Sequence, residues 1–278
     1  MTSALPFVCG ISGWSYPDWE GWVYPPRCGD TLAYVAPYVD FIEINSTFYA
    51  MPQASMAARW LDRTQHLADF FFTAKLHRAF THEGLRDTAT AAAFREGLRP
   101  LRAGGRLQAL LAQFPASFDD TAEHAARLAW LRDAFHEVPL IVEVRHRSWQ
   151  APAALAFLQR LGVSVASLDY PSDAASFDLD TCRVGTQRYL RLHGRNREAW
   201  GNPRAGRDQT YNYLYNADEL DALAARAQRL QQGARPAMVA ANNHFCGQAL
   251  VNALELRARA APAGGSAGAL AGALSAAR

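Results

Sequence analysis

The chain has 278 residues, half of them hydrophobic, and its formal net charge of only +2 excludes the globally basic surface of a dedicated nucleic-acid binder. Its four cysteines are scattered without the spacing of a zinc site, and no apolar run is long enough to cross a membrane. With no signal-peptide pattern at its start, we expect a reduced cytoplasmic protein without a membrane segment.

Eight strand patterns alternate with helical patterns along the chain. The strands are expected at residues 7–12, 39–45, 70–76, 107–113, 140–145, 163–169, 188–194 and 237–243. Helices are expected at residues 31–37, 53–63, 87–102, 121–135, 151–160, 216–231 and 245–260. Residues 170–187 carry no helical stripe, so we expect a short or irregular segment in place of the sixth helix.

The predicted helix ends carry residues that satisfy free backbone groups. Thr31 and Thr121 are expected to be N-caps, because their hydroxyl groups can accept from the first backbone N–H groups of a helix. Asn216 followed by Glu219 has the spacing of a capping box. Gly104 is expected to end the helix of residues 87–102.

Eight alternating strands and helices predict a parallel sheet of the TIM (β/α)₈ barrel type. The main competitor, an open doubly wound sheet, usually has a GxGxxG turn after its first strand, and GISGWS at residues 10–15 does not match this motif. We therefore predict one TIM-barrel domain over residues 1–260. Residues 261–278 are rich in alanine and glycine and are expected to form a poorly ordered tail.

Polar side chains recur at the predicted carboxyl ends of the strands. In the second strand Ile42 and Ile44 point to one face, whereas Glu43 and Asn45 point to the other. The same pattern gives further inward residues on the other strands, namely Ser12, Lys75, Gln113, Glu143, Arg145, Asp169, Arg191, His193 and Asn242 or Asn243. Because TIM-barrel active sites lie at the carboxyl ends of the strands, we expect these residues to form one pocket. The alternative is a structural salt-bridge network, with Glu43 and Arg191 as its first candidates.

The chain resembles the YecE-like family of bacterial and archaeal proteins, catalogued as domain of unknown function seventy-two. The resemblance lies in seven segments, which are in chain order GISGWSYPDWEGWVYP, FIEINSTFY, AKLHRAFTHE, VEVRHRSW, YLRLHGRN, YNYLY and NNHFCGQALVNALEL. It spans about residues 10–256 and implies a TIM-barrel fold. It implies no established reaction, so the chemistry must be argued from the residues.

A phosphate-bearing substrate is the first chemistry that the ring favours. TIM barrels often hold phosphate with the loops after strands seven and eight, which here carry His193, Arg195 and Asn243. Lys75 and Arg145 add cationic donors, and a guanidinium fork suits phosphate oxygens. The simpler interpretation is that these segments are only a turn and a helix cap.

Acid–base catalysis and metal binding are the other two chemistries. Glu43 and Glu143 are carboxylates of the kind that flank a bond in glycosidases, with His193 available for proton transfer. Their basic neighbours favour the ionised carboxylate, which suits a base or an anchor better than a proton donor. Glu43, Glu143, Asp169 and His193 are also metal-ligand types, but three basic residues share the same space. We predict no cofactor, and a divalent metal is not favoured.

Aromatic residues follow several of the strands. Trp14 and Trp149 come directly after strand ends and are expected to line the pocket. The loop of residues 195–215 interleaves arginines with tryptophan and tyrosine, a pattern that can stack bases and contact the phosphates of single-stranded RNA. The simpler role for such rings is packing a long loop against the barrel.

Together these patterns predict a hydrolase-type enzyme for a small anionic, phosphorylated or nucleotide-like substrate; a glycosidic substrate is the second choice. Catalytic roles are assigned to Glu43, Glu143, His193 and Asp169. Substrate binding is assigned to Asn45, Lys75, Gln113, Arg145, Arg195, Asn242, Asn243, Trp14 and Trp149. The alternative is a non-catalytic protein that binds RNA or a nucleotide through the loop of residues 195–215.

Overall fold

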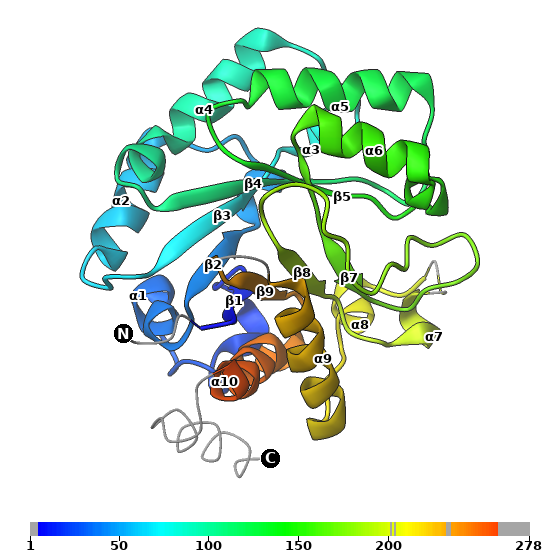
Figure 1. Ribbon diagram of the computed structural model, residues 1–278. Coiled ribbons are helices and arrows are strands. Elements are labelled where there is room, and N and C mark those ends of the chain that lie inside the picture. Colours follow the sequence, from blue (N-terminus) through cyan, green and yellow to red (C-terminus); the bar gives the residue numbers. More distant parts are fainter. Residues whose placement is uncertain (1–4, 201, 203, 232–234, 261–278) are drawn as a thin grey trace. The chain divides into compact units, whose positions relative to one another are not determined.

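The computed structural model describes residues 5–200, 202, 204–231 and 235–260 (Figure 1). The predicted tail of residues 261–278 lies outside the described residues. The contacts divide the chain into two compact units, which are described separately. The first unit comprises residues 1–42, 168–171 and 188–278, and the second comprises residues 43–167 and 172–187.

The second unit contains four parallel strands covered by helices. Its strands are β3 (Phe71–Lys75), β4 (Leu107–Gln113), β5 (Leu140–Glu143) and β6 (Ser164–Val165), paired in this order. Its helices are α2 (Ala54–Thr64), the short α3 (Arg78–Thr81), α4 (Thr88–Ala103), α5 (Ala122–Ala134) and α6 (Pro152–Leu161), with short 3₁₀ helices at Ser46–Phe48 and Arg147–Gln150. Phe72 of β3 and Phe94 of α4 are wholly buried. The buried faces of the helices thus meet the strands on which the second unit's candidate residues lie.

The first unit is built around β9 (Ala237–Ala241), which pairs in parallel with β1 (Phe7–Ser12) and with β8 (Tyr189–Leu192). Its helices are α1 (Thr31–Val35), the short α7 (Arg197–Trp200) and α8 (Arg207–Thr210), α9 (Ala217–Leu230) and α10 (Gln248–Ala260), with 3₁₀ helices at Pro17–Trp19, Ala36–Tyr38 and Phe245–Gly247. Helix α10 packs on β1 and β9, and α9 packs on β9 (Figure 1). The carboxyl ends of β8 and β9 continue into loops, and most candidate residues of the first unit lie there.

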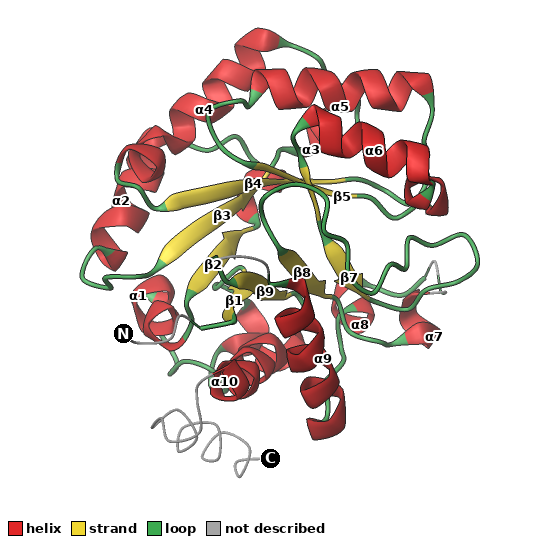
Figure 2. Ribbon diagram, in the orientation of Figure 1, coloured by secondary structure: helices red, strands yellow, loops and turns green. Residues whose placement is uncertain are grey.

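Strands and helices alternate as the sequence predicts (Figure 2). The strand order is β6-β5-β4-β3-β2-β1-β9-β8-β7, where β2 is Phe41–Ile44 and β7 is Ser167–Asp169. The α/β fold class of TIM-barrel type is therefore confirmed. The sixth strand is interrupted at Ala166, so it appears as β6 and β7, and residues 170–188 contain no helix, as predicted.

Most predicted helix ends are found at the expected residues. Thr121 caps α5 with its side chain, and Asn216 and Glu219 form both halves of a capping box at α9. The N-cap of α1 is Asp30, whose carboxylate accepts from the Ala33 N–H, and not Thr31 as predicted. An aspartate is as good a cap as a threonine, so sequence alone does not separate two such neighbours.

Two loops of the first unit are fastened to each other. The Trp19 indole, in the loop after β1, donates to the His244 carbonyl at 2.6 Å, and the Asp18 carboxylate accepts from the Cys246 N–H at 2.6 Å. The Tyr16 ring stacks on the His244 ring with centroids 4.5 Å apart. The loop after β1 and the turn after β9 therefore hold each other in place.

Replacing Gly97 by alanine is expected to lower the free energy of unfolding by about 1–3 kcal/mol. Gly97 lies inside α4, where alanine is normally the better residue. Here a Cβ would overlap the Pro52 carbonyl group, so that backbone would have to move. Urea unfolding measures the change. Gly29→Ala is the control, because a Cβ at this position would meet no atom within 4 Å. Equal losses of stability in the two variants would contradict the predicted overlap.

Candidate functional site

Candidate residues of the second unit lie together on one face of its sheet. Lys75 is next to Leu111 in the register of β3 and β4, and Gln113 is next to Glu143 in the register of β4 and β5. Because side chains alternate along a strand, Lys75, Gln113 and Glu143 point to the same side. Glu143 is wholly buried, as is Glu43 on β2.

The Glu143 carboxylate is paired with the guanidinium of Arg145. Arg145 donates from Nε at 2.9 Å and from Nη2 at 2.6 Å, both to Oε1 of Glu143. The Arg145 side chain is 15% exposed and that of Glu143 is 0% exposed, so this ion pair is largely removed from water. A carboxylate that accepts two charge-assisted hydrogen bonds is held in its ionised form and in one orientation.

Lys75 is held at the end of β3 by residues that follow β2. Its ammonium group lies 4.2 Å from the centre of the Phe48 ring. The Thr47 hydroxyl group donates to the Lys75 carbonyl at 2.6 Å and also lies 3.1 Å from the Ile44 carbonyl. Asn45 comes directly before this 3₁₀ turn, and its buried Oδ1 has no hydrogen-bond partner among the described residues. Lys75 and Asn45 are thus placed by the same short turn.

His82 follows α3 in the same region. Its Nδ1 lies 2.9 Å from the Thr81 hydroxyl group, and the Phe48 ring meets its own ring edge-on at 5.0 Å. Partial burial, followed by repulsion from Lys75, Arg145, Arg78 and Arg127, lowers the pKa of His82 to about 4. The imidazole is therefore neutral at physiological pH, and its surroundings are electropositive.

Trp149, which was predicted to line the pocket, packs beneath the loop after β4. The side chain is wholly buried, its indole donates to the Phe118 carbonyl at 2.8 Å, and its ring stacks on Phe118 with centroids 5.7 Å apart. Gln113 has a local contact as well, because its Nε2 donates to the Phe114 carbonyl at 2.9 Å. Trp149 is a core residue because its large ring fills the space beneath the loop after β4.

An open hollow of about 650 Å³ lies beside the turn after β5. Its lining residues are His146, Arg147, Ser148, Gln150, Ala151 and Ala175. The His146 ring accepts from the Ser148 N–H and so caps the 3₁₀ helix that begins there. His146 therefore fixes the start of this turn as its N-cap.

In the first unit, His193 lies at the end of β8 between polar neighbours from two strands. Its Nδ1 is 3.0 Å from Nδ2 of Asn242, which follows β9, and its Nε2 is 3.4 Å from Nη1 of Arg191. His193 is wholly buried, and Arg191 and Asn242 are nearly so. The rings of Tyr170, Trp200 and Tyr211 surround the imidazole at 5.8–6.3 Å. His193 and Asn242, both predicted site residues, are therefore in contact.

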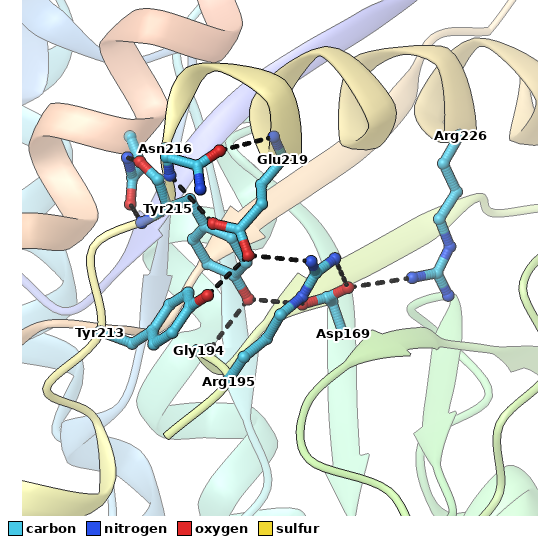
Figure 3. A network of polar contacts seen from close by, with 9 residues as sticks. Asp169, Gly194, Arg195, Tyr213, Tyr215, Asn216, Glu219 and Arg226 are labelled. Carbon is cyan, nitrogen blue, oxygen red and sulfur yellow. Dashed lines mark hydrogen bonds and ion pairs between the residues drawn. The ribbon is translucent and has the colours of Figure 1, made fainter. Parts of the chain in front are cut away.

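Asp169 and Arg195, two further predicted site residues, form an ion pair with each other (Figure 3). Arg195 binds both carboxylate oxygens of Asp169, from Nε at 2.9 Å and from Nη2 at 2.8 Å. Its third nitrogen, Nη1, donates to Glu219 at 3.0 Å. The buried Arg226 adds a second cation 3.7 Å from Asp169. Arg195 therefore differs from the predicted anion clamp, because two carboxylates already occupy its donors.

Two tyrosines complete this network (Figure 3). The Tyr215 hydroxyl group donates to Asp169 at 2.7 Å and accepts from the Gly194 N–H at 3.0 Å. The Tyr213 hydroxyl group donates to Glu219 at 2.6 Å. Burial and the neighbouring carboxylates raise the pKa of Tyr213 to about 12 and that of Tyr215 well above its usual value. Both hydroxyl groups thus remain donors at physiological pH, and that of Tyr215 also holds Gly194, the residue after His193.

Asn243 is wholly buried and fixes the loop before α9. Its Nδ2 donates to the Tyr213 carbonyl at 2.8 Å and to Oδ1 of Asn252 at 2.9 Å. Asn252 in turn bonds both backbone groups of Tyr215. These contacts give Asn243 a structural role. Trp14, the remaining predicted residue, is partly exposed after β1.

A family model described as "Protein of unknown function DUF72" matches residues 8–272 of the chain. The chain belongs to the DUF72 family. The UPF0759 protein YunF of Bacillus subtilis strain 168 is 27% identical over 264 residues, which cover 89% of this chain and 92% of YunF. These comparisons support the resemblance to the YecE-like family found in the sequence.

Two solved structures carry the same family name. A DUF72 family protein of Thermotoga maritima MSB8 is 30% identical with a TM-score of 0.79, covering 91% of this chain and 98% of that chain. One of Enterococcus faecalis V583 is 25% identical with a TM-score of 0.79, covering 91% of this chain and 94% of that chain. They agree with the fold of this DUF72 chain and name no activity.

Several residues of this DUF72 chain that hold the candidate residues in place were not predicted from the sequence. Thr47, Tyr215 and Asn252 are polar and buried, and each bonds the backbone of a candidate residue or of a neighbour. The one sequence feature that points to them is their position, because each lies in a segment that resembles the YecE-like family. Within the described ranges no three His, Cys, Asp or Glu residues gather as metal ligands would, and every helix is too short or too polar to span a bilayer.

Proposed function

We propose that this DUF72 protein is a hydrolase-type enzyme that acts on a small anionic, phosphorylated or nucleotide-like substrate. The observation that carries the proposal is the pairing of buried Glu143 with Arg145 on the face that also presents Lys75. Burying a carboxylate at a strand end is costly, and apolar packing would stabilise the sheet at least as well. A functional reason for these charges is therefore favoured over a purely structural one.

The second unit supplies the groups on which this proposal rests. In the second unit, Glu143 orients water or accepts a proton, because its contact with Arg145 favours the ionised form. Lys75 and Arg145 donate to the anionic group. Proton transfer by His193 of the first unit stays a prediction from the sequence, and Asn242 contacts its ring. The role of Asp169 in the proposal is to brace the loop after His193 and not to act on the substrate.

A ligand screen and one charge-removing variant test the proposal. Thermal shifts are measured with inorganic phosphate, nucleotides and sugar phosphates, with and without divalent ions, since a ligand that binds the native state raises its melting temperature. Ligands that raise it are then assayed for hydrolysis. Glu143→Gln is expected to lower turnover by about 10²–10⁴-fold. Glu96→Gln, which removes the same charge from an exposed residue of α4, is the control.

The alternative is a binder of RNA without catalysis. Binding of single-stranded RNA that falls steeply with salt and is unchanged in Glu143→Gln, without any turnover, would overturn the proposal. Because the side chains of Arg195, Tyr213 and Tyr215 are already bonded to Asp169 or Glu219, they do not favour this alternative. Loss of turnover in Glu143→Gln at an unchanged melting temperature would support the enzyme.

A further inference from the structure

We propose that the hollow beside the turn after β5 is a binding site of its own, which holds the oxyanion group of a small molecule, either a phosphate or a carboxylate. The inference goes beyond the proposed function, because the residues that line the hollow do not include Lys75, Glu143 or Arg145. The volume of about 650 Å³ lies within the range of small-molecule sites, which is roughly 300–1,000 Å³. The polar groups of the lining indicate which ligand fits.

Arg147 is fixed beside the hollow in a way that leaves two parallel donors unused. Its backbone N–H donates to the Ala175 carbonyl at 2.8 Å, and its Nη1 donates to the Ala174 carbonyl at 3.0 Å. Nε and Nη2 have no acceptor among the described residues, and none of the described carboxylates forms an ion pair with Arg147. Arg195 uses this same pair of nitrogens to bind both carboxylate oxygens of Asp169, at 2.9 and 2.8 Å. Arg147 therefore presents an unused guanidinium fork of the kind that binds a carboxylate or a phosphate.

The other polar side chains of the hollow have their acceptors occupied and keep their donors. Nδ1 of His146 accepts from the Ser148 N–H at 3.3 Å, so the neutral ring carries its hydrogen on Nε2. Oε1 of Gln150 accepts from the Asp178 N–H at 2.5 Å, and Oγ of Ser148 accepts from the Asp120 N–H at 2.7 Å. Neither aspartate is a lining residue. The Nε2 atoms of His146 and Gln150 have no acceptor in the described part of the chain, so both are available as donors.

The charges around the hollow agree with an anionic ligand. The Asp173 carboxylate does not occupy the Arg147 fork, because it accepts from the Ala175 N–H at 2.9 Å and from the Ser176 hydroxyl group at 2.8 Å. Ala151, which lines the hollow, is also the N-cap of α6, and no side chain caps this helix. The first N–H groups of a helix carry partial positive charge. A ligand rich in acceptors is therefore favoured over a cation.

The test follows the Nε–H resonance of Arg147 by NMR, assigned by its loss in Arg147→Met. Inorganic phosphate and acetate are titrated separately at constant ionic strength. At least one of them is expected to shift this resonance in a saturable way, and the tighter of the two identifies the oxyanion as a phosphate or a carboxylate. Because the readout is local, phosphate that binds beside Lys75 and Arg145 does not affect the result.

Gln150→Glu shows whether the donors of the hollow select the anion. A glutamate keeps an oxygen for the Asp178 N–H but replaces the Nε2 donor by negative charge. The dissociation constant from the same NMR titration is expected to rise at least about tenfold, with the melting temperature unchanged. Gln108→Glu places the same charge on an exposed residue of β4 and should leave the dissociation constant unchanged.

Two outcomes would overturn the inference. One is the absence of a saturable shift of the Arg147 resonance with either probe, and the other is equal affinity in Gln150→Glu and the native protein. Neither outcome affects the proposed function, which depends on turnover and its loss in Glu143→Gln. Conversely, a protein without turnover that still binds phosphate or acetate at Arg147 would contradict the proposed function and support this site.

Discussion

Asp169→Ala is expected to lower the free energy of unfolding by about 3–5 kcal/mol. The substitution removes the acceptor of three donors, namely Nε and Nη2 of Arg195 and the hydroxyl group of Tyr215. It also removes a carboxylate that lies 3.7 Å from the buried Arg226. Loss of a negative charge beside a buried cation is the costly part, since the Arg226 side chain is only 9% exposed. Urea unfolding followed by tryptophan fluorescence measures the loss.

Two further variants show whether the negative charge of Asp169 or the shape of its side chain accounts for the lost stability. Asp169→Asn keeps an oxygen for the Tyr215 hydroxyl group but removes the negative charge, so an intermediate loss is expected. Asp69→Ala removes an exposed carboxylate and is expected to change stability by less than about 0.5 kcal/mol. A small effect of Asp169→Ala would show that the network around Arg195 does not stabilise the loop after β8.

Gly194→Ala is expected to lower the free energy of unfolding by about 3 kcal/mol. Gly194 has φ +84°, a conformation that costs an alanine about 1–2 kcal/mol. A Cβ at this position would also lie only 2.6 Å from Cβ of Tyr213, so the loop before α9 would have to shift. The same shift would disturb the hydrogen bond from the Gly194 N–H to Tyr215, next to His193.

Gly105→Ala is the matched control for this substitution. Gly105 also has a positive φ, +69°, but a Cβ there would meet nothing within 4 Å. Its expected loss is the conformational part alone, about 1 kcal/mol. The difference between the two variants in a denaturant titration measures the steric part, and equal losses would rule that part out.

The fold was predictable because local signals and the sheet pattern agree. Strand β4 and the capping box of α9 were found at the expected residues, since alternation along a strand and capping at a helix end are local in sequence. The short helix α3 was missed, because four residues carry too few periodic positions. The break at Ala166 was missed as well, because the apolar pattern continues through it.

The candidate residues were found more easily than their partners. Alternation alone placed Lys75, Gln113 and Glu143 on one face, and the register of β3, β4 and β5 agrees. Which charges pair depends on distances between segments far apart in the chain, so the contacts of Asp169 with Arg195 and Tyr215 could not be read from spacing. Trp149 shows the same limit, because a ring after a strand can face the core.

The contact between the loop after β1 and the turn after β9 limits how this protein can be re-engineered. A chimera that replaced residues 16–24 by a loop without Trp19 and Asp18 would deprive the His244 carbonyl of its indole donor and the Cys246 N–H of its carboxylate acceptor. Residues 16–24 and 244–247 therefore constitute a single exchangeable module, and loop grafting in this family should transplant both segments together.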